Sequence, residues 1–539
     1  MTRMPLGKAV LIGSAVIGVL ALLVRLAHLG SATPWYDDFY HLLAARHWLQ
    51  DGTFAIEGGV YSRAPLYTRL VAESLRLFGD TIAAGRVPAV IAGTLWAVAV
   101  FIWTRRVAGA VAAWTAGLLL AFDPGAINLS QWVRFYTLHG LLVWVGAVCG
   151  YHAVIDPSRW SRKLLLGGAA LGAFGVANLL QETTIIAVGG FLLWAGLTLL
   201  PWIPGWLQAD LPRRRAILAA GVLLALAAAA WFVASGRAGD YWRTFQTIPF
   251  WMEPGQANPR WFLWWLAGRF GILWVLFPLA VVLAVARYPR PALFSVTMFL
   301  TGLAAVSLGT NTAERYLYFA LPFFFVLWGM ALATLLPAIR LAAEQAATTL
   351  RFGDRARKLA GAGFLAALLG FVVLQTEAFR IGVRMVFPGS GERPYREADW
   401  NMVLPRLRSL VDSADVVLSS YVLKPLYYFD RGDAHFSWTE TAEAGFENGQ
   451  PVEFARDYRT GLPTLSSAES LQRVISCYQS GLVLTERFHL DRAHLLNPET
   501  TAFLRTHTDS VPLPADSWVL AFRWRHSVPA NQPGCPPWR

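Results

Sequence analysis

The chain has 539 residues, a formal net charge of +12 and a hydrophobic content of 55%, and its apolar residues occur in long runs. Such runs exclude an ordinary soluble protein, whose surface helices carry apolar residues on one face only. The basic excess calls for no nucleic-acid partner, because positively charged cytoplasmic loops and contact with anionic membrane lipids account for it.

The apolar runs predict an α-helical polytopic membrane protein with about eleven transmembrane helices. We expect these helices at Ala9–Val24, Val87–Trp103, Val107–Phe122, Leu138–Val154, Leu164–Leu180, Thr184–Leu200, Ala216–Val233, Leu263–Ala286, Ala292–Leu308, Tyr316–Leu336 and Leu359–Leu374. The first run is expected to be retained, because no small-residue cleavage site follows it.

Basic residues indicate the orientation of the helices, because short cytoplasmic loops collect lysine and arginine. The basic clusters are Arg3 with Lys8, Arg105 with Arg106, Arg159 to Lys163, Arg213 to Arg215, Arg287 with Arg290, and Arg340 to Lys358. All of them lie inside if the N-terminus is cytoplasmic and the predicted helix count holds. We therefore predict a multi-pass protein of the inner (plasma) membrane whose C-terminal part is extracytoplasmic, or periplasmic.

The first extracytoplasmic loop, residues 29–86, is expected to be structured. Apolar residues recur at helical spacing in 39–49 and 66–78, with charged residues between them, which is typical of short helices in the membrane interface. Gly58-Gly59 and Pro65 separate the two segments. The transmembrane domain as a whole is predicted to span residues 1–385, including this loop.

Residues 386–539 differ in character and predict an extracytoplasmic α/β domain. Strand-like segments occur at 415–420, 481–485 and 518–522, and helical segments at 400–411 and 498–506. Cys477 and Cys535 both fall in this domain, where an oxidising compartment permits a disulfide. The sequence leaves their pairing open, because it does not show whether the two residues are close enough.

Two neighbouring acids, Asp37 and Asp38, follow the first apolar run by a few residues. Ionisable side chains at bilayer depth cost roughly 2.5–3.5 kcal/mol each, so acids at a membrane boundary are functional candidates. In a pair of adjacent carboxyl groups the pKa of at least one is raised, and an ionised partner can accept a proton. Aspartate is also a good helix N-cap, so a cap for the helix near Phe39 stays open as the alternative.

Three arginines, Arg63, Arg134 and Arg315, are expected on the same face as these acids. The guanidinium group presents a planar fork of donors that matches phosphate oxygens, so the set favours a phosphate site. Any one of them could instead extend to lipid headgroups. Glu182, at the outer end of a predicted helix, could pair with one of these arginines, bind an acceptor or form a structural ion pair.

No cofactor is assigned from the sequence. His41, His47 and His139 lack the spacing of zinc ligands, so a divalent metal has no support here. There is no P-loop and no glycine-rich dinucleotide turn, which argues against a nucleotide-dependent reaction.

Several of these residues lie in segments that resemble the integral-membrane GT-C glycosyltransferases. More narrowly, the chain is similar to the bacterial branch related to protein O-mannosyltransferases and to the aminoarabinose transferase of lipid A. The resemblance rests on Trp35-Tyr36-Asp37-Asp38, Arg63-Ala64-Pro65-Leu66-Tyr67, Leu77-Phe78-Gly79, Val133-Arg134-Phe135-Tyr136 and Glu314-Arg315-Tyr316, in this order along the chain.

The resemblance implies an inverting glycosyltransferase that moves a hexosyl or pentosyl group from a polyprenyl-phosphate-linked donor to a hydroxyl of a protein, lipid or glycan acceptor, outside the cytoplasm. Asp37 would be the general base, and Asp38 would orient the acceptor or position a partner group. Arg63, Arg134 and Arg315 would hold the lipid phosphate as it leaves with growing charge. Further substrate contacts are assigned to Tyr136, Glu182, Glu314 and Tyr316.

Two other classes of function remain open at this point. A flippase or transporter of lipid-linked substrates is expected to place charged residues near mid-membrane and to contain repeated halves. In this chain the candidate residues gather at the outer boundary instead. A membrane scaffold with a partner-binding exported tail would need no ordered set of acids and arginines. Assaying sugar transfer from a polyprenyl-phosphate sugar separates these classes.

Overall fold

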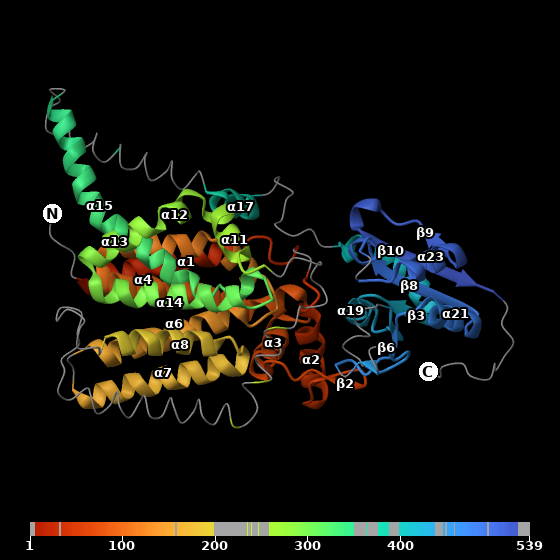
Figure 1. The fold of residues 1–539 in the computed structure, drawn as a ribbon. Coiled ribbons are helices and arrows are strands. Elements are labelled where there is room, and N and C mark those ends of the chain that lie inside the picture. Colours follow the sequence, from red (N-terminus) through yellow and green to blue (C-terminus); the bar gives the residue numbers. More distant parts are fainter. Residues whose placement is uncertain are drawn as a thin grey trace.

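The computed structural model describes residues 6–31, 34–156, 159–198, 258–349, 376–387, 398–436, 446–447, 450–457, 459–492 and 495–526, with single residues at 234, 239, 246 and 363. A helical bundle, a helical first loop and a C-terminal β-sheet domain lie side by side in Figure 1. The bundle contains α1 Leu6–Leu26, α4 Ile82–Phe122, α5 Pro124–Ser130, α6 Tyr136–Ile155, α7 Trp160–Leu180, α8 Thr184–Leu197, α11 Trp261–Phe270, α12 Ile272–Val275, α13 Phe277–Arg287, α14 Pro289–Leu308, η1 Glu314–Tyr316, α15 Leu321–Thr349 and α17 Glu377–Val386.

The described residues include 6 helices that are long and apolar enough to cross a membrane, so the chain is a multi-pass membrane protein. One of them, α4, joins two helices, because Gly109 has φ 90° and ψ −172°. A continuous helix would separate Phe101 from Gly117 by about 24 Å. A Cβ on Gly117 would nevertheless lie 3.3 Å from the Cβ of Phe101. The chain therefore reverses at Gly109, and its two halves correspond to the two helices predicted at 87–103 and 107–122.

Another predicted helix is interrupted. The run at 263–286 forms α11, α12 and α13, because Gly271 has φ 50° and ψ −119° and the backbone turns there. The helices predicted at 216–233 and 359–374 lie outside the described residues, Gly363 excepted. The total of about eleven spans therefore stays a prediction.

The first loop contains the two expected helices, α2 Asp38–Asp51 and α3 Pro65–Phe78, with a hairpin of β1 Ala55–Ile56 and β2 Gly59–Val60 between them. Gly52 ends α2 in the left-handed conformation, with φ 76°. The first half of α2 is buried, and the helix contacts both α3 and the C-terminal domain. A position of the two helices in the membrane interface stays a prediction.

The C-terminal domain is built on a six-stranded sheet. Its strands are β3 Val416–Ser419, β4 Ala434–Phe436, β7 Thr464–Leu465, β8 Ser480–Glu486, β9 Asp509–Val511 and β10 Val519–Arg525, beside a separate hairpin of β5 Phe446–Glu447 and β6 Gln450–Pro451. The strand order is β7-β4-β3-β8-β10-β9. The strands β3, β4, β7 and β8 are parallel, and β10 pairs antiparallel with β8 and β9. Its helices are η2 Trp400–Met402, α18 Leu404–Ser413, α19 Leu423–Phe429, α21 Ala468–Cys477, α22 Arg487–Leu490, α23 Pro498–His507 and η3 Ala515–Ser517.

Alternating side chains divide this domain into three layers, because successive residues of a strand point to opposite faces. Val417 packs on one face with Leu407 of α18. Val416 packs on the other face with Leu471 of α21 and Leu504 of α23. The segments predicted as strands at 415–420, 481–485 and 518–522 form β3, β8 and β10. Cys477 belongs to a disulfide, Cys149 is a free thiol, and Cys535 lies outside the described residues.

The C-terminal domain rests on the first loop. Phe39 of α2 and Tyr427 of α19 pack edge to face, with ring centroids 5.2 Å apart. Arg46 of α2 donates a hydrogen bond to the carbonyl oxygen of Tyr427 at 3.0 Å and forms an ion pair with Asp80 at 2.8 Å. The two units therefore share one end of the bundle.

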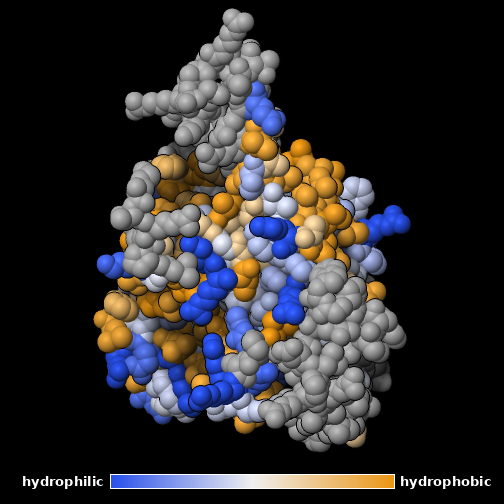
Figure 2. All heavy atoms as spheres, turned by 90° about the vertical axis from the view of Figure 1, so that its left-hand side faces the viewer, coloured by the Kyte–Doolittle hydropathy of each residue, from blue (hydrophilic) through white to orange (hydrophobic). Residues whose placement is uncertain are grey.

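Figure 2 looks onto the opposite end of the bundle, where hydrophilic residues gather and hydrophobic residues surround them. The turns from α6 to α7 and from α13 to α14 reach this end in Figure 1, and they carry Arg159, Arg162, Arg287 and Arg290. The described basic turns and the C-terminal domain therefore lie at opposite ends of the helices.

We predict that these two ends face opposite sides of the membrane. Single cysteines introduced at Arg106, Arg159 or Arg290 should resist a membrane-impermeant maleimide in intact cells and react after permeabilisation. A cysteine at Arg505 in α23 should react in both states. The parent without an introduced cysteine is the control, and equal labelling of both sets in intact cells would contradict the arrangement.

Candidate active site

The site begins at the turn between α1 and α2, where the two neighbouring acids have different surroundings. Asp37 occupies the N-cap position of α2, but its side chain accepts no capping hydrogen bond. Its carboxylate is 32% exposed. Asp38 is fully buried and accepts a hydrogen bond from the backbone N–H of Trp35 at 3.1 Å. The helix-cap alternative therefore does not describe Asp37, whose carboxylate is available for other contacts.

Arg134 lies opposite Asp37, in the short segment between α5 and α6. Its side chain is 2% exposed, and its Nη2 lies 3.5 Å from Oδ2 of Asp37. Its Nη1 donates a hydrogen bond to the hydroxyl of Tyr61 at 3.0 Å. The guanidinium also lies 5.0 Å from the ring centre of Phe135 and 5.6 Å from that of Tyr136. Burial of this cation is thus balanced by an anion, a hydroxyl and aromatic faces.

Arg63 and Arg315 approach the same carboxylate from two further segments. Arg63, just before α3, donates a hydrogen bond to Oε1 of Gln181 at 3.1 Å. Arg315, in η1, lies 5.3 Å from the ring centre of its neighbour Tyr316. Both guanidinium groups contribute to the electrostatic environment of Asp37.

The two acids are driven in opposite directions by these surroundings. Burial raises the pKa of Asp37, but the positive charges of Arg134, Arg315, Arg63 and Arg459 together hold it below its ordinary value. For Asp38, burial dominates and raises the pKa to about 7, although the positive charges of Arg86 and Arg134 oppose the shift. One carboxylate is therefore ionised at neutral pH, while its neighbour is close to its titration point.

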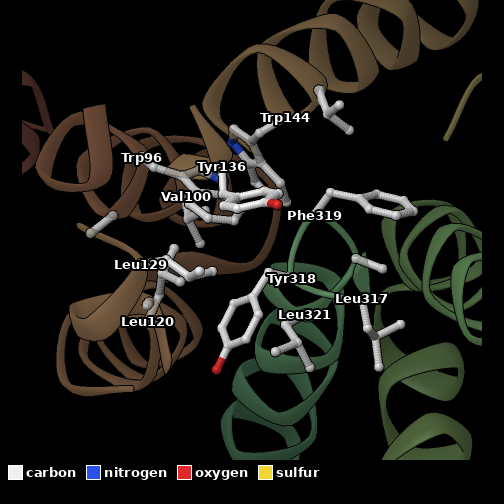
Figure 3. Close-up of a cluster of buried hydrophobic side chains, with 14 of the residues drawn as sticks. Trp96, Val100, Leu120, Leu129, Tyr136, Trp144, Leu317, Tyr318, Phe319 and Leu321 are labelled. Carbon is white, nitrogen blue, oxygen red and sulfur yellow. The ribbon is translucent and has the colours of Figure 1, made fainter. Parts of the chain in front are cut away.

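The η1 segment that carries Arg315 is held by the aromatic core beneath it. Figure 3 shows Tyr136 and Trp144 of α6 facing Phe319, with Tyr318 beside them. The hydroxyl of Tyr318 donates a hydrogen bond to Asp123 at 3.0 Å. It passes so close to Gly125 that a Cβ there would lie 1.2 Å from the hydroxyl oxygen. This close approach ties η1 to the start of α5.

The structure brings together most of the predicted site residues. Asp37, Arg63, Arg134 and Arg315 surround one point, and Tyr136 lies beside Arg134. Tyr316 lies beside Arg315, and its hydroxyl accepts a hydrogen bond from Asn311 at 3.0 Å. Glu314 accepts a hydrogen bond from Trp265 at 3.0 Å. Glu182 is exposed, and its neighbour Gln181 contacts Arg63.

Three residues of the site were not predicted from the sequence: Tyr40, Tyr61 and Arg459. The ring of Tyr61 stacks on that of Tyr40, with centroids 4.9 Å apart, and the hydroxyl of Tyr40 accepts a hydrogen bond from Arg459 at 3.1 Å. Tyr61 belongs to the segment that carries Arg63, so its place in the site could have been predicted from the sequence. Arg459 lies far along the chain, and nothing in the sequence indicated that it reaches the site. Within the described ranges, no group of three His, Cys, Asp or Glu could hold a metal ion.

Comparison with known proteins assigns the fold. No protein-family model matches the chain, and no curated protein matches it in sequence. ArnT from Cupriavidus metallidurans in the apo state has a TM-score of 0.59 at 16% identity, covering 96% of this chain and 98% of that one. Its complex with undecaprenyl phosphate has a TM-score of 0.58 at 15% identity over the same shares of both chains.

The archaeal oligosaccharyltransferase AglB from Archaeoglobus fulgidus, in complex with an inhibitory peptide and a dolichol-phosphate, has a TM-score of 0.59 at 13% identity. That match covers 92% of this chain and 72% of that one. ArnT and AglB are both GT-C glycosyltransferases. The GT-C fold implied by the sequence resemblance is therefore confirmed.

The raised pKa of Asp38 predicts a pH-dependent penalty on folding. The unfolded chain loses this proton near the ordinary value of 3.8 and the folded chain near 7, so the folded state loses stability as the pH rises from about 4 to about 7. The Asp38→Asn variant has no carboxyl group at this position, so this pH-dependent loss of stability is absent. The melting temperature of the variant should therefore rise relative to wild type across this interval. The exposed Asp412→Asn is the control, and a pH-independent offset between Asp38→Asn and wild type would contradict the assignment.

Proposed function

We propose that this chain, which has the GT-C fold, is an inverting glycosyltransferase that uses a polyprenyl-phosphate-linked sugar donor. The observation that carries the proposal is the partly exposed carboxylate of Asp37, 3.5 Å from the buried Arg134 and under the influence of Arg63 and Arg315. A lipid phosphate is a suitable ligand for such a cluster. The ArnT structure with undecaprenyl phosphate and the AglB structure with dolichol-phosphate support this class of donor.

In the proposed reaction Asp37 takes the proton of the acceptor hydroxyl. The acceptor oxygen bonds to the anomeric carbon as the bond from that carbon to the phosphate oxygen breaks, so the configuration inverts. The electron pair leaves with the polyprenyl phosphate, which gains negative charge. Arg63, Arg134 and Arg315 stabilise this charge as it develops. A bound phosphate offsets the positive potential of the arginines, so the pKa of Asp37 rises with the donor in place and strengthens it as a base.

Asp38 is assigned a positioning role. Its side chain is fully buried in this structure and therefore does not reach an acceptor. It accepts a hydrogen bond from the backbone of Trp35 and so holds that segment beside the site. Tyr136 and Tyr316 are assigned hydrogen bonds to the phosphate, and Glu314 and Glu182 substrate contacts at the margin. The acceptor would be a protein, lipid or glycan hydroxyl.

The site shares one end of the bundle with the C-terminal domain, while the described basic turns occupy the other end (Figures 1 and 2). Because basic turns are cytoplasmic, we place the site and residues 386–539 outside the cytoplasm, with the N-terminus inside and the chain in the inner (plasma) membrane. A lipid-linked donor fits this face, since it diffuses in the same membrane.

The function is tested with purified protein in proteoliposomes. Radiolabelled sugar should pass from polyprenyl-phosphate sugar to an extract of envelope acceptors only when this protein is present. Absence of transfer with every lipid-linked sugar and acceptor fraction, while the donors are used by an unrelated transferase, would contradict the proposal.

Asp37→Asn keeps the shape of the side chain and removes its ability to accept a proton. We expect turnover to fall by roughly 10²–10⁴-fold, the usual range for a general base. Expression and donor binding should persist, because the amide oxygen of asparagine can still accept a hydrogen bond from the buried Arg134. The matched control is Asp51→Asn, an exposed acid at the end of the same helix. If Asp37→Asn retains normal turnover while Asp38→Asn abolishes it, the two roles are exchanged.

The phosphate cluster is tested at Arg315. Arg315→Ala removes both the charge and the fork of donors, whereas Arg315→Lys keeps the charge. We expect the KM for donor to rise by about tenfold or more in Arg315→Ala and by less in Arg315→Lys, in line with loss of a charge-assisted hydrogen bond. Kinetics of both variants identical to wild type would remove Arg315 from the site.

A further inference from the structure

A turn of the C-terminal domain reaches the catalytic end of the bundle. It comprises Asp457, Arg459, Thr460 and Gly461 and is called the Asp457 turn below. The backbone N–H of Gly58, between β1 and β2, donates a hydrogen bond to the carbonyl oxygen of Thr460 at 3.0 Å. This bond joins a loop of the membrane domain to a residue about 400 positions further along the chain.

Glycines let the two backbones approach to contact. A Cβ on Gly59 would lie 2.4 Å from the carbonyl carbon of Arg459, and one on Gly461 would lie 2.3 Å from that of Gly58. Gly461 also has φ +70°, which favours glycine. No other residue type fits either position without moving the turn, so these glycines set how closely the domain docks.

Contacts within the C-terminal domain hold the Asp457 turn. The carboxylate of Asp457 accepts hydrogen bonds from the backbone N–H of Thr460 at 3.0 Å and from its hydroxyl at 2.8 Å. The buried His435 lies 3.5 Å from the same carboxylate. Arg456 donates a hydrogen bond to the carbonyl oxygen of Gly461 at 2.8 Å. A turn held in this way projects the neighbouring Arg459 in a defined direction.

Arg459 points toward the proposed phosphate cluster. Its Nη1 donates a hydrogen bond to the hydroxyl of Tyr40 at 3.1 Å, and its guanidinium lies 5.4 Å from the centre of that ring. Tyr40 stacks on Tyr61, whose hydroxyl is bound by Arg134 at 3.0 Å. Arg459 and Arg134 are therefore attached to the two members of one stacked tyrosine pair. The charge of Arg459 also acts on Asp37.

We infer that the C-terminal domain completes the active site by delivering Arg459 as a fourth arginine for the donor phosphate. The inference rests on the proposed function. Four guanidinium groups act on Asp37, and one of them, Arg459, also acts on the carboxylate of Asp457. Four positive charges against these two carboxylates leave the site with surplus positive charge for an anion. A departing phosphate monoester, which carries up to two negative charges, matches this surplus better than a neutral acceptor does.

The test is binding of a short-chain polyprenyl monophosphate to the full-length protein in detergent, measured by calorimetry, with the neutral polyprenol as reference for the lipid tail. Arg459→Gln should weaken monophosphate binding by roughly tenfold, the effect of losing one charge-assisted hydrogen bond. Polyprenol binding should not change. Arg459→Lys should recover part of the loss. The exposed Arg505→Gln in α23, of the same charge change, should bind as wild type.

Gly461→Ala tests delivery by the turn. It should weaken monophosphate binding as Arg459→Gln does, and the double variant should be no weaker than Arg459→Gln alone, because both act through the same guanidinium. If the Arg459→Gln protein does not fold, monophosphate binding by the Gly461→Ala variant tests the inference in its place.

The outcomes separate the two proposals. If wild-type protein binds monophosphate no better than polyprenol, the proposed function falls. If wild type prefers the monophosphate and Arg459→Gln binds it equally well, the function stands and Arg459 is not part of the phosphate site. In the sugar-transfer assay, an effect of Arg459→Gln that is confined to the KM for acceptor would also overturn this inference.

Discussion

The site depends on one buried cation. Arg134 is 2% exposed at the end of a membrane bundle, where an unpaired charge would cost several kcal/mol. Its partners come from separate segments: Asp37 from the turn after α1, and Tyr61 from the first loop. Packing that satisfies this guanidinium therefore also assembles the site. Stability and function are coupled here, because the ion pair that offsets the burial of Arg134 also keeps the proposed base ionised.

The same constraint explains why two adjacent aspartates differ. Helix α2 starts between them, which directs Asp37 toward Arg134 and Asp38 into the protein. Burial is the largest single influence on the pKa of both residues, but several arginines together outweigh it at Asp37 and do not at Asp38. A pair of acids of one residue type thus acquires an ionised member and one that titrates near neutrality, and the difference arises from position alone.

Much of the membrane part was predictable, because bilayer thickness imposes long apolar runs that are visible in the sequence. The break at Gly271 was not, since a glycine inside an apolar run is compatible with a continuous helix. The cluster of Asp37, Arg63, Arg134 and Arg315 was expected from its shared face. Arg459 could not be predicted, because its place depends on how two units dock, and that contact follows from shape and not from periodicity.

The proposed reaction requires a lipid phosphate to bind among these arginines, beside Asp37. The most direct measurement is an experimental structure of the full-length protein in lipid with a polyprenyl monophosphate. We expect phosphate density within hydrogen-bonding distance of Arg134 and Arg315, with the carboxylate of Asp37 facing the position that the sugar would occupy. Phosphate density elsewhere, with the arginine cluster and Asp37 unchanged from the unliganded protein, would contradict it.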